Sequence, residues 1–128
     1  MAVTIFAAID VGSYEVSMDI YQISPKIGIE KIDEVRSRIE LGHDTYTNGK
    51  ISYESAQRLG EVLGDFSRIM KEYKVTSYRA CATSTLQEAR NVWIVLEQVY
   101  QRTGIRVEIL SNSEQRFFGY KSIAAKEA

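Results

Sequence analysis

The first part of the chain has the hydrophobic pattern of three consecutive β-strands. Residues 3–9 are almost all apolar and lead into an aspartate and a glycine, which predicts a central strand, buried on both faces, that ends in a tight loop. Apolar residues then tend to alternate over residues 16–23 and again over 27–41, with turn residues at 24–28 between them. The pattern predicts a three-stranded meander.

The remainder of the chain alternates between helical and strand patterns. Ser52 can cap a helix, and a short apolar strand over 77–82 is followed by a second amphipathic helix that Gly104 ends. A last strand over 106–110 leads to a terminal helix that begins at Ser111. The apolar face of the first helix comprises Ala56, Leu59, Leu63, Phe66, Met70 and Tyr73, and that of the second comprises Val92, Val95, Leu96, Val99 and Tyr100.

This order of elements predicts an α/β fold of ribonuclease-H-like type. Three strands followed by helix, strand, helix, strand and helix give a mixed sheet whose later strands are joined by parallel crossovers. Residues 1–128 contain no repeat, low-complexity tract or linker, so we expect a single domain. The last residues stop within a helical pattern that has no cap, so we expect the chain to be part of a longer protein.

Composition argues against several classes of protein. The chain has 45% hydrophobic and 26% charged residues among 128, which is enough for one core and unlike a disordered segment. Sixteen basic and 17 acidic residues give a net charge of -1, so we expect no nucleic-acid partner. A single cysteine, no basic leader and no apolar run near the roughly 20 residues of a membrane span predict a cytoplasmic protein without a membrane segment.

The first candidate site is the sequence IDVGS at residues 9–13. Here the carboxylate of Asp10, the permissive backbone of Gly12 and the hydroxyl of Ser13 meet at one strand end. Such a loop can bind phosphate through backbone amides and magnesium through the carboxylate. An ordinary hairpin turn has the same residue types, so the motif alone leaves both interpretations open.

The second candidate is ATSTLQEARN at residues 82–91, directly after a predicted strand. Thr83 and Ser84 offer hydroxyls where a helix amino terminus would favour phosphate. Ser84 and Gln87 also have the spacing of a capping box, which satisfies free backbone amides without a ligand. Phosphate binding and capping both remain open here.

The third candidate is SNSEQ at residues 111–115, after the last predicted strand. Glu114 either faces a cleft or forms a capping box with Ser111, since the two have the required spacing. The lone His43 has no catalytic partner nearby in the sequence, so we interpret it as a surface loop residue.

In order, these motifs resemble the signatures of the bacterial Ppx/GppA family of exopolyphosphatases and guanosine pentaphosphate phosphatases. The matching segments, IDVGS, ELGHDTYTNGKIS, ATSTLQEARN and VEILSNSEQ, span almost the whole chain. The resemblance implies the first half of an actin-like ATPase superfamily catalytic region. It also implies that the full-length protein, which can be a homodimer, removes terminal phosphate from polyphosphate or a phosphorylated guanine nucleotide with Mg²⁺.

The resemblance also implies roles for individual residues. Asp10, Gly12 and Ser13 correspond to the first phosphate loop, with Asp10 as the implied metal ligand. Thr83 and Ser84 fall in the second signature, near the cleft, as phosphate-binding residues. The implied catalytic position comprises Glu114 and Gln115, with Gln115 standing where the family has its catalytic glutamate.

Three positions depart from the family pattern. Glu15 introduces a negative charge beside the first loop, and at ~4 Å from a phosphate it would cost about 4 kcal/mol at an intermediate dielectric unless it points away. Gln87 replaces an arginine, for which Arg90 lies one helical turn away. Gln115 cannot accept a proton, which removes a base that contributes roughly 10²–10⁴-fold unless Glu114 substitutes.

Three functions therefore stay open from the sequence. One is a phosphatase in which Asp10 holds magnesium and Glu114 acts as base. Another is a degenerate homologue that binds a phosphorylated ligand or a protein partner without turnover, as Glu15, Gln87 and Gln115 favour. The third is a nuclease of ribonuclease-H type, for which we find neither the further acidic strand ends nor the basic patch that it needs. We expect the chain alone to be inactive, because the family's second phosphate loop is not within it.

Overall fold

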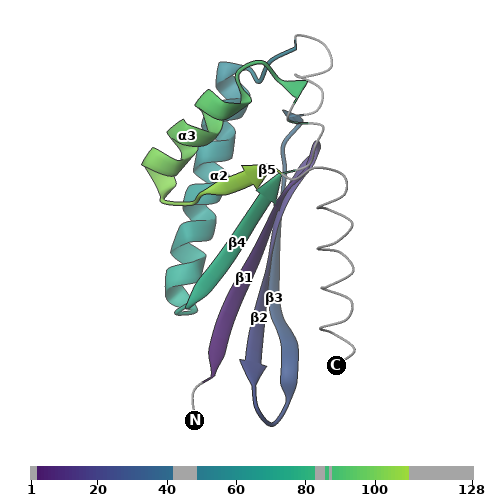
Figure 1. Cartoon of the computed structure of the whole chain (residues 1–128), viewed down its shortest axis with the longest axis vertical. Coiled ribbons are helices and arrows are strands. Elements are labelled where there is room, and N and C mark those ends of the chain that lie inside the picture. Colours follow the sequence, from purple (N-terminus) through teal and green to yellow (C-terminus); the bar gives the residue numbers. More distant parts are fainter. Residues whose placement is uncertain (1–2, 42–48, 83–85, 87, 110–128) are drawn as a thin grey trace.

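The computed structural model describes residues 3–41, 49–82, 86 and 88–109, which form a five-stranded sheet and two long helices. The elements are β1 (Thr4–Val11), β2 (Glu15–Ser24), β3 (Gly28–Arg38), α2 (Tyr53–Glu72), β4 (Ser77–Ala82), α3 (Val92–Thr103) and β5 (Val107–Ile109). Figure 1 shows them in the sheet order β3-β2-β1-β4-β5. The predicted order of elements is confirmed as far as β5, and the predicted terminal helix lies outside the described residues.

Antiparallel and parallel pairing meet at strand β1. It pairs antiparallel with β2, which in turn pairs antiparallel with β3. On its other side β1 is parallel to β4, and β4 is parallel to β5. The predicted meander, the parallel crossovers and the central place of the first strand are all confirmed, which gives the expected mixed α/β sheet.

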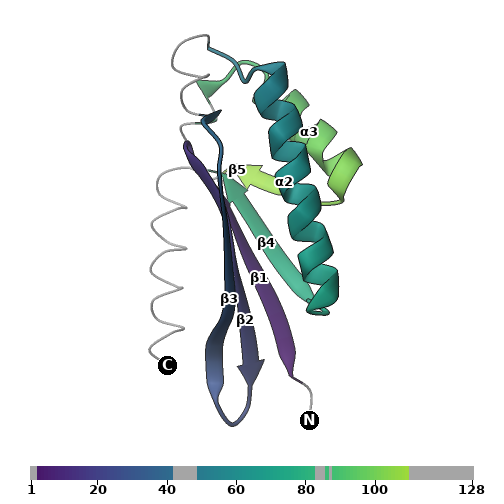
Figure 2. The ribbon, with the colours of Figure 1, turned by 180° about the vertical axis from the view of Figure 1, so that it is seen from behind.

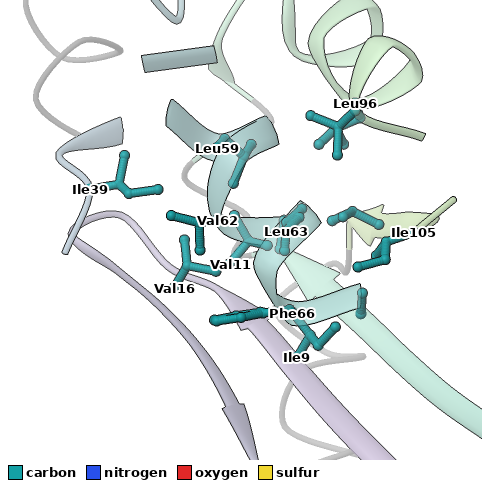
Figure 3. Packing of buried hydrophobic residues seen from close by; sticks show 14 of the residues in the cluster. Ile9, Val11, Val16, Ile39, Leu59, Val62, Leu63, Phe66, Leu96 and Ile105 are labelled. Carbon is teal, nitrogen blue, oxygen red and sulfur yellow. The ribbon is translucent and has the colours of Figure 1, made fainter. Parts of the chain in front are cut away.

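The hydrophobic core lies between the sheet and the two helices, which both cover the same face (Figures 1 and 2). Figure 3 shows Val11 and Val16 of the sheet near Phe66 of α2. In the same view Leu96 extends from α3 toward the side of α2 that carries Leu59. The predicted apolar stripes are confirmed in large part. The buried residues of α2 and α3 include Leu59, Val62, Leu63, Phe66, Met70, Val92, Val95, Leu96 and Val99.

Strand β1 is fully buried on one face only; on the other face Phe6 and Ala8 are half-buried, so the prediction of burial on both faces is confirmed only in part. Ala7, Ile9 and Val11 face the helices and are buried, whereas Asp10 is exposed. The physical reason is that α2 and α3 lie on the same side of the sheet. Neither helix of the described residues covers the opposite side, which we call the open face, and Asp10 lies on it.

A bulge changes the facing of residues along the edge strand β3. In the pairing of β2 with β3, Ile20 is opposite Asp33 and Tyr21 is opposite Lys31, so Ile32 has no partner on β2. This extra residue shifts the alternation of side chains between the two faces of the sheet. Ile32 and Val35 pack against the core, whereas Ile29 is 41% exposed and Ile27 is 67% exposed in the preceding turn. The alternation that the sequence predicted over residues 27–41 is thus interrupted at the bulge.

Both helices begin or end at the residues that the sequence indicated. The Ser52 side chain accepts a hydrogen bond from the Ser55 amide at the start of α2, and Gly104 ends α3 in the left-handed conformation at φ 79°. Near the end of α2, the Tyr73 hydroxyl donates to Asp33 Oδ2 at 2.7 Å, which ties the helix to the bulged strand. Neither helix of the described ranges has the apolar length needed to cross a membrane.

Replacing Phe66 with alanine should destabilise the fold strongly. The side chain is only 2% exposed, and its loss would leave a cavity between α2 and the sheet. We expect Phe66→Ala to lower the free energy of unfolding by about 3–5 kcal/mol, measured by urea unfolding with far-UV circular dichroism. Trp93→Ala is the matched control, because that aromatic side chain is 63% exposed. Equal effects of the two variants would contradict this core.

Candidate functional site

Two of the sequence motifs leave the sheet at the same edge. Asp10 lies at the carboxyl end of β1, and Gly12 and Ser13 follow directly. Because β4 is parallel to β1 and pairs Ala82 with Val11, the segment after β4 starts beside this loop. In open α/β sheets, ligands commonly bind outside the carboxyl ends of the strands.

The loop after β1 is a tight hairpin turn. The Gly12 amide donates to the Glu15 carbonyl oxygen at 2.8 Å, and the ladder of β1 and β2 continues at Val11 opposite Val16. A Cβ atom at Gly12 would lie 2.9 Å from the same carbonyl oxygen, a distance that real side chains do not tolerate. The structure therefore contains the hairpin turn that the motif left open, and the Gly12 amide, a candidate donor to phosphate, is bonded within that turn. Phosphate binding at Gly12 stays a prediction.

The turn is also held by the chain after β3. The Ile39 amide donates to the Tyr14 carbonyl oxygen at 3.1 Å. Ser13, between Gly12 and Tyr14, is half-buried, while the Tyr14 side chain is 56% exposed. Two backbone hydrogen bonds thus fix the turn that carries the Ser13 hydroxyl.

Asp10 has the electrostatic surroundings of a cation ligand. Although part of the residue is exposed, partial desolvation of its carboxyl group raises its pKa, and the negative charges of Asp19 and Glu15 raise it further. A cation would relieve this excess of negative charge. No group of three or more His, Cys, Asp or Glu residues within the described ranges could hold a metal ion. Since Mg²⁺ commonly uses one or two carboxylates together with substrate phosphates and waters, Asp10 alone fits that mode of binding.

Ion pairs run along the open face beside Asp10. Lys31 Nζ lies 3.7 Å from Asp19 Oδ1 and 3.5 Å from Glu34 Oε2. Arg36 pairs with Glu34 and, at 3.2 Å, with Glu15 Oε2. The Arg36 guanidinium lowers the pKa of Glu34. We call these five residues the charge ladder, and its three carboxylates outnumber its two cations.

The ladder settles the orientation of Glu15, which the sequence left open. Both carboxylate oxygens of Glu15 lie near Arg36 Nη1, at 3.3 Å and 3.2 Å. The side chain therefore extends over β3 and is paired with an arginine, although its charge still contributes to the raised pKa of Asp10.

Cys81 lies on β4 opposite Asp10, but it does not have the surroundings of a reactive thiolate. Burial is the main cause that raises the pKa of the thiol, and Arg79 opposes that effect. Arg79 Nη2 itself lies 2.8 Å from Glu108 Oε2 on β5. The thiol form is thus favoured at neutral pH.

Sequence reasoning missed the role of Asn91, the last residue of the second motif. Its Oδ1 accepts from the Ile51 amide and its Nδ2 donates to the Ile51 carbonyl oxygen, both at 2.8 Å. Beside it, the Arg90 amide donates to the Gly49 carbonyl oxygen at 2.9 Å. An asparagine before a helix signals a cap, yet this side chain makes no cap bond and instead clamps a distant segment.

The second motif leads directly to the amino terminus of α3, which begins at Val92 with Asn91 as its N-cap residue. Within the motif, Leu86 and Glu88 have 3₁₀ conformation. The Arg90 guanidinium lies next to Gly49. Its compensation for Gln87 stays a prediction, because Gln87 lies outside the described residues. Several predicted site residues lie outside the described residues, namely His43, Thr83, Ser84, Gln87, Ser111, Glu114 and Gln115.

Gly12→Ala should distort the turn. The added methyl group would press on the Glu15 carbonyl oxygen, and we expect a loss of about 1–3 kcal/mol in the free energy of unfolding. Gly64→Ala in α2 is the control, because its Cβ would make only an ordinary contact of 3.9 Å with Thr103. That variant should be neutral or gain about 0.5–1 kcal/mol in urea unfolding. Equal tolerance of both substitutions would contradict the tight turn.

Removing the Asp10 charge should stabilise the fold at neutral pH. Because the folded-state pKa is raised above 3.8, the folded chain binds this proton more tightly than the unfolded chain does, and the advantage is lost as the pH rises above 3.8. Asp10→Asn should therefore raise the free energy of unfolding at pH 7, with a gain that shrinks as the pH falls toward 3.8. Urea unfolding across this pH range measures the effect. Glu30→Gln, an exposed carboxylate on β3, is the control, and a less stable Asp10→Asn protein at pH 7 would refute the assignment.

Known proteins resemble this chain over most of its length. A guanosine-5'-triphosphate,3'-diphosphate pyrophosphatase from Aliivibrio fischeri is 26% identical over 119 residues, which cover 93% of this chain and 24% of that protein. Exopolyphosphatase 1 from Mycobacterium leprae is 26% identical over 100 residues, 71% of this chain and 30% of that protein. The chain therefore spans about a quarter of the length of such relatives.

The fold agrees with the same family. The crystal structure of the Aquifex aeolicus Ppx/GppA family member superposes with a TM-score of 0.93 and 27% sequence identity, covering 97% of this chain and 40% of that one. Its likeness supports the actin-like, ribonuclease-H-like class that the sequence predicted. A sequence model of the Ppx/GppA phosphatase family matches residues 20–126, well over half of the chain. The chain belongs to the Ppx/GppA phosphatase family.

Proposed function

We propose that the full-length protein removes the terminal phosphate from polyphosphate or from a phosphorylated guanine nucleotide. The observation that carries this proposal is the position of Asp10, at the carboxyl end of the central strand and beside the fixed turn at Gly12. Relatives named for both substrates match the chain over most of its length. A cytoplasmic location and a homodimer of the full-length protein remain predictions.

The chemistry at this edge of the sheet rests on charge and hydroxyl groups. Asp10 would hold Mg²⁺, which when bound supplies positive charge to the phosphate oxygens. The hydroxyl of Ser13, on the turn that two backbone bonds fix, would donate to the same phosphate. Thr83 and Ser84 would donate from the segment after β4, which starts beside Val11. Each of these residues binds or orients the phosphate, and none of them is a base.

The general base that would activate water is the group in which this chain departs from its family. The resemblance places it at Glu114 and Gln115, and a glutamine side chain cannot accept a proton from water. We propose that hydrolysis is slow because of Gln115, with Glu114 as the group that takes the proton. The negative ladder beside Asp10 also makes bound magnesium a requirement for binding a polyanion.

The second candidate function is binding of the same phosphorylated ligand without turnover. The specific observation in its favour is the turn itself, in which the Gly12 amide is already bonded to the Glu15 carbonyl oxygen. That amide is not directed at a ligand, while Asp10 and Ser13 keep their capacity to bind. Loss of the base at Gln115 would then leave a ligand sensor in place of an enzyme.

Phosphate release from the full-length protein distinguishes the two candidates. We expect slow release from polyphosphate or guanosine pentaphosphate with Mg²⁺, and an increase of roughly 10²–10⁴-fold in Gln115→Glu. Asp10→Asn in the Gln115→Glu background is the control and should lose the gain, because it removes the proposed metal ligand.

Other outcomes also assign roles. Release by the unmodified protein that Gln115→Glu does not change but Glu114→Gln abolishes would make Glu114 the only base. Binding of the substrate with no release from either the unmodified protein or Gln115→Glu would favour the second candidate.

A further inference from the structure

The turn that carries Ser13 has a negative charge built into it. Glu15 is the residue whose carbonyl oxygen closes the turn, so its position cannot move far from Gly12. Glu15 is also the first residue of β2, directly after the turn. A polyanion at this edge would meet the same charge and be repelled by it.

One arginine on the neighbouring edge strand holds that carboxylate. Arg36 Nη1 lies 3.3 Å and 3.2 Å from the two Glu15 oxygens. The guanidinium is itself anchored by Glu34, which accepts from Arg36 Nε at 2.7 Å. Arg36 is thus fixed on one side and holds Glu15 with the other.

The arginine directly opposite Glu15 does not share this task. In the strand pairing Glu15 is opposite Arg38, but Arg38 pairs with Glu40 at 3.6 Å and is 79% exposed. The diagonal neighbour Arg36 takes the carboxylate in its place. Two arginines lie on the same strand and the same face, and only Arg36 contacts Glu15.

We propose that Arg36 is a positioning residue that holds the Glu15 carboxylate over β3 and thereby allows a polyanion to bind at the Gly12 turn. The inference deepens the proposed function and rests on it. The pair accounts for an acidic residue beside a phosphate loop: Glu15 is tolerated because Arg36 directs its charge away from the loop and balances it. Glu34 serves this arrangement by holding the guanidinium in place.

A purely structural role would have different consequences. Ion pairs between exposed side chains contribute little to stability, and Arg36 and Glu15 are 58% and 48% exposed. Removing Arg36 should hardly change the thermal unfolding temperature but should weaken the binding of an anion. The weakening should diminish as salt rises, because salt screens exposed charges.

The test measures the affinity of the full-length protein for tripolyphosphate with Mg²⁺ by calorimetry. We expect Arg36→Gln to weaken binding about tenfold, as one uncompensated charge about 10 Å away would at the effective dielectric of a protein surface. Glu15→Gln should bind at least as well as the unmodified protein. The double variant Glu15→Gln/Arg36→Gln should return to within about twofold of it, because the Glu15 charge that Arg36 holds is then absent.

Arg38→Gln is the matched control and should bind normally, while Arg36→Lys should recover part of the loss. Unchanged binding by Arg36→Gln would overturn the inference. Binding by the double variant as weak as by Arg36→Gln would also overturn it, since Arg36 would then contact the phosphate itself. If the unmodified protein does not bind tripolyphosphate at all, the proposed function fails and this inference fails with it.

Discussion

The site depends on the parallel pairing of β1 with β4. These strands are separated by the β2–β3 hairpin and helix α2, yet Val11 lies opposite Ala82 in the sheet. Only this pairing brings the segment after β4 beside the turn after β1. The crossover is stabilised by α2, whose Leu63 and Phe66 bury against the sheet. The core and the candidate site therefore have one origin, because the same apolar contacts that fold the chain bring the carboxyl ends of β1 and β4 together.

Electrostatics at this edge balance two needs. The charge ladder has three carboxylates and two cations, an excess of negative charge that favours a magnesium ion and opposes a polyanion. Desolvation and acidic neighbours disfavour the ionised form of Asp10, and the magnesium ion that we propose for it would offset both effects. Arg36 pairs with one of these neighbours, Glu15, and holds its carboxylate over β3.

The sequence predicted the elements well, because long amphipathic periods and local signals determine them. The Ser52 cap, the Gly104 stop and the apolar stripe of α2 depend on residues a few positions apart. The burial of β1 could not be predicted, since an apolar run does not tell on which face the helices pack. The bulge at Ile32 could not be predicted either, because it is a property of how β2 and β3 pair and not of either strand alone.

The same distinction applies to the candidate site. Asp10 and the turn at Gly12 were visible as one local motif, and the structure places them together. The partner of Glu15 was not visible, because Arg36 is 21 residues away and Arg38 is the direct neighbour across the strands. The sequence alone does not indicate that Glu15 pairs with Arg36, its diagonal neighbour, and not with Arg38, which is directly opposite.

The clamp formed by Asn91 has a mechanical consequence. One side-chain amide holds both the donor and the acceptor of Ile51, so rotation of either partner would break two hydrogen bonds at once. The backbone bond from Arg90 to Gly49 adds a third connection close by. Three hydrogen bonds thus join residues 49–51 before α2 directly to residues 90–91 before α3, so a displacement of either segment acts on the other without involving the sheet.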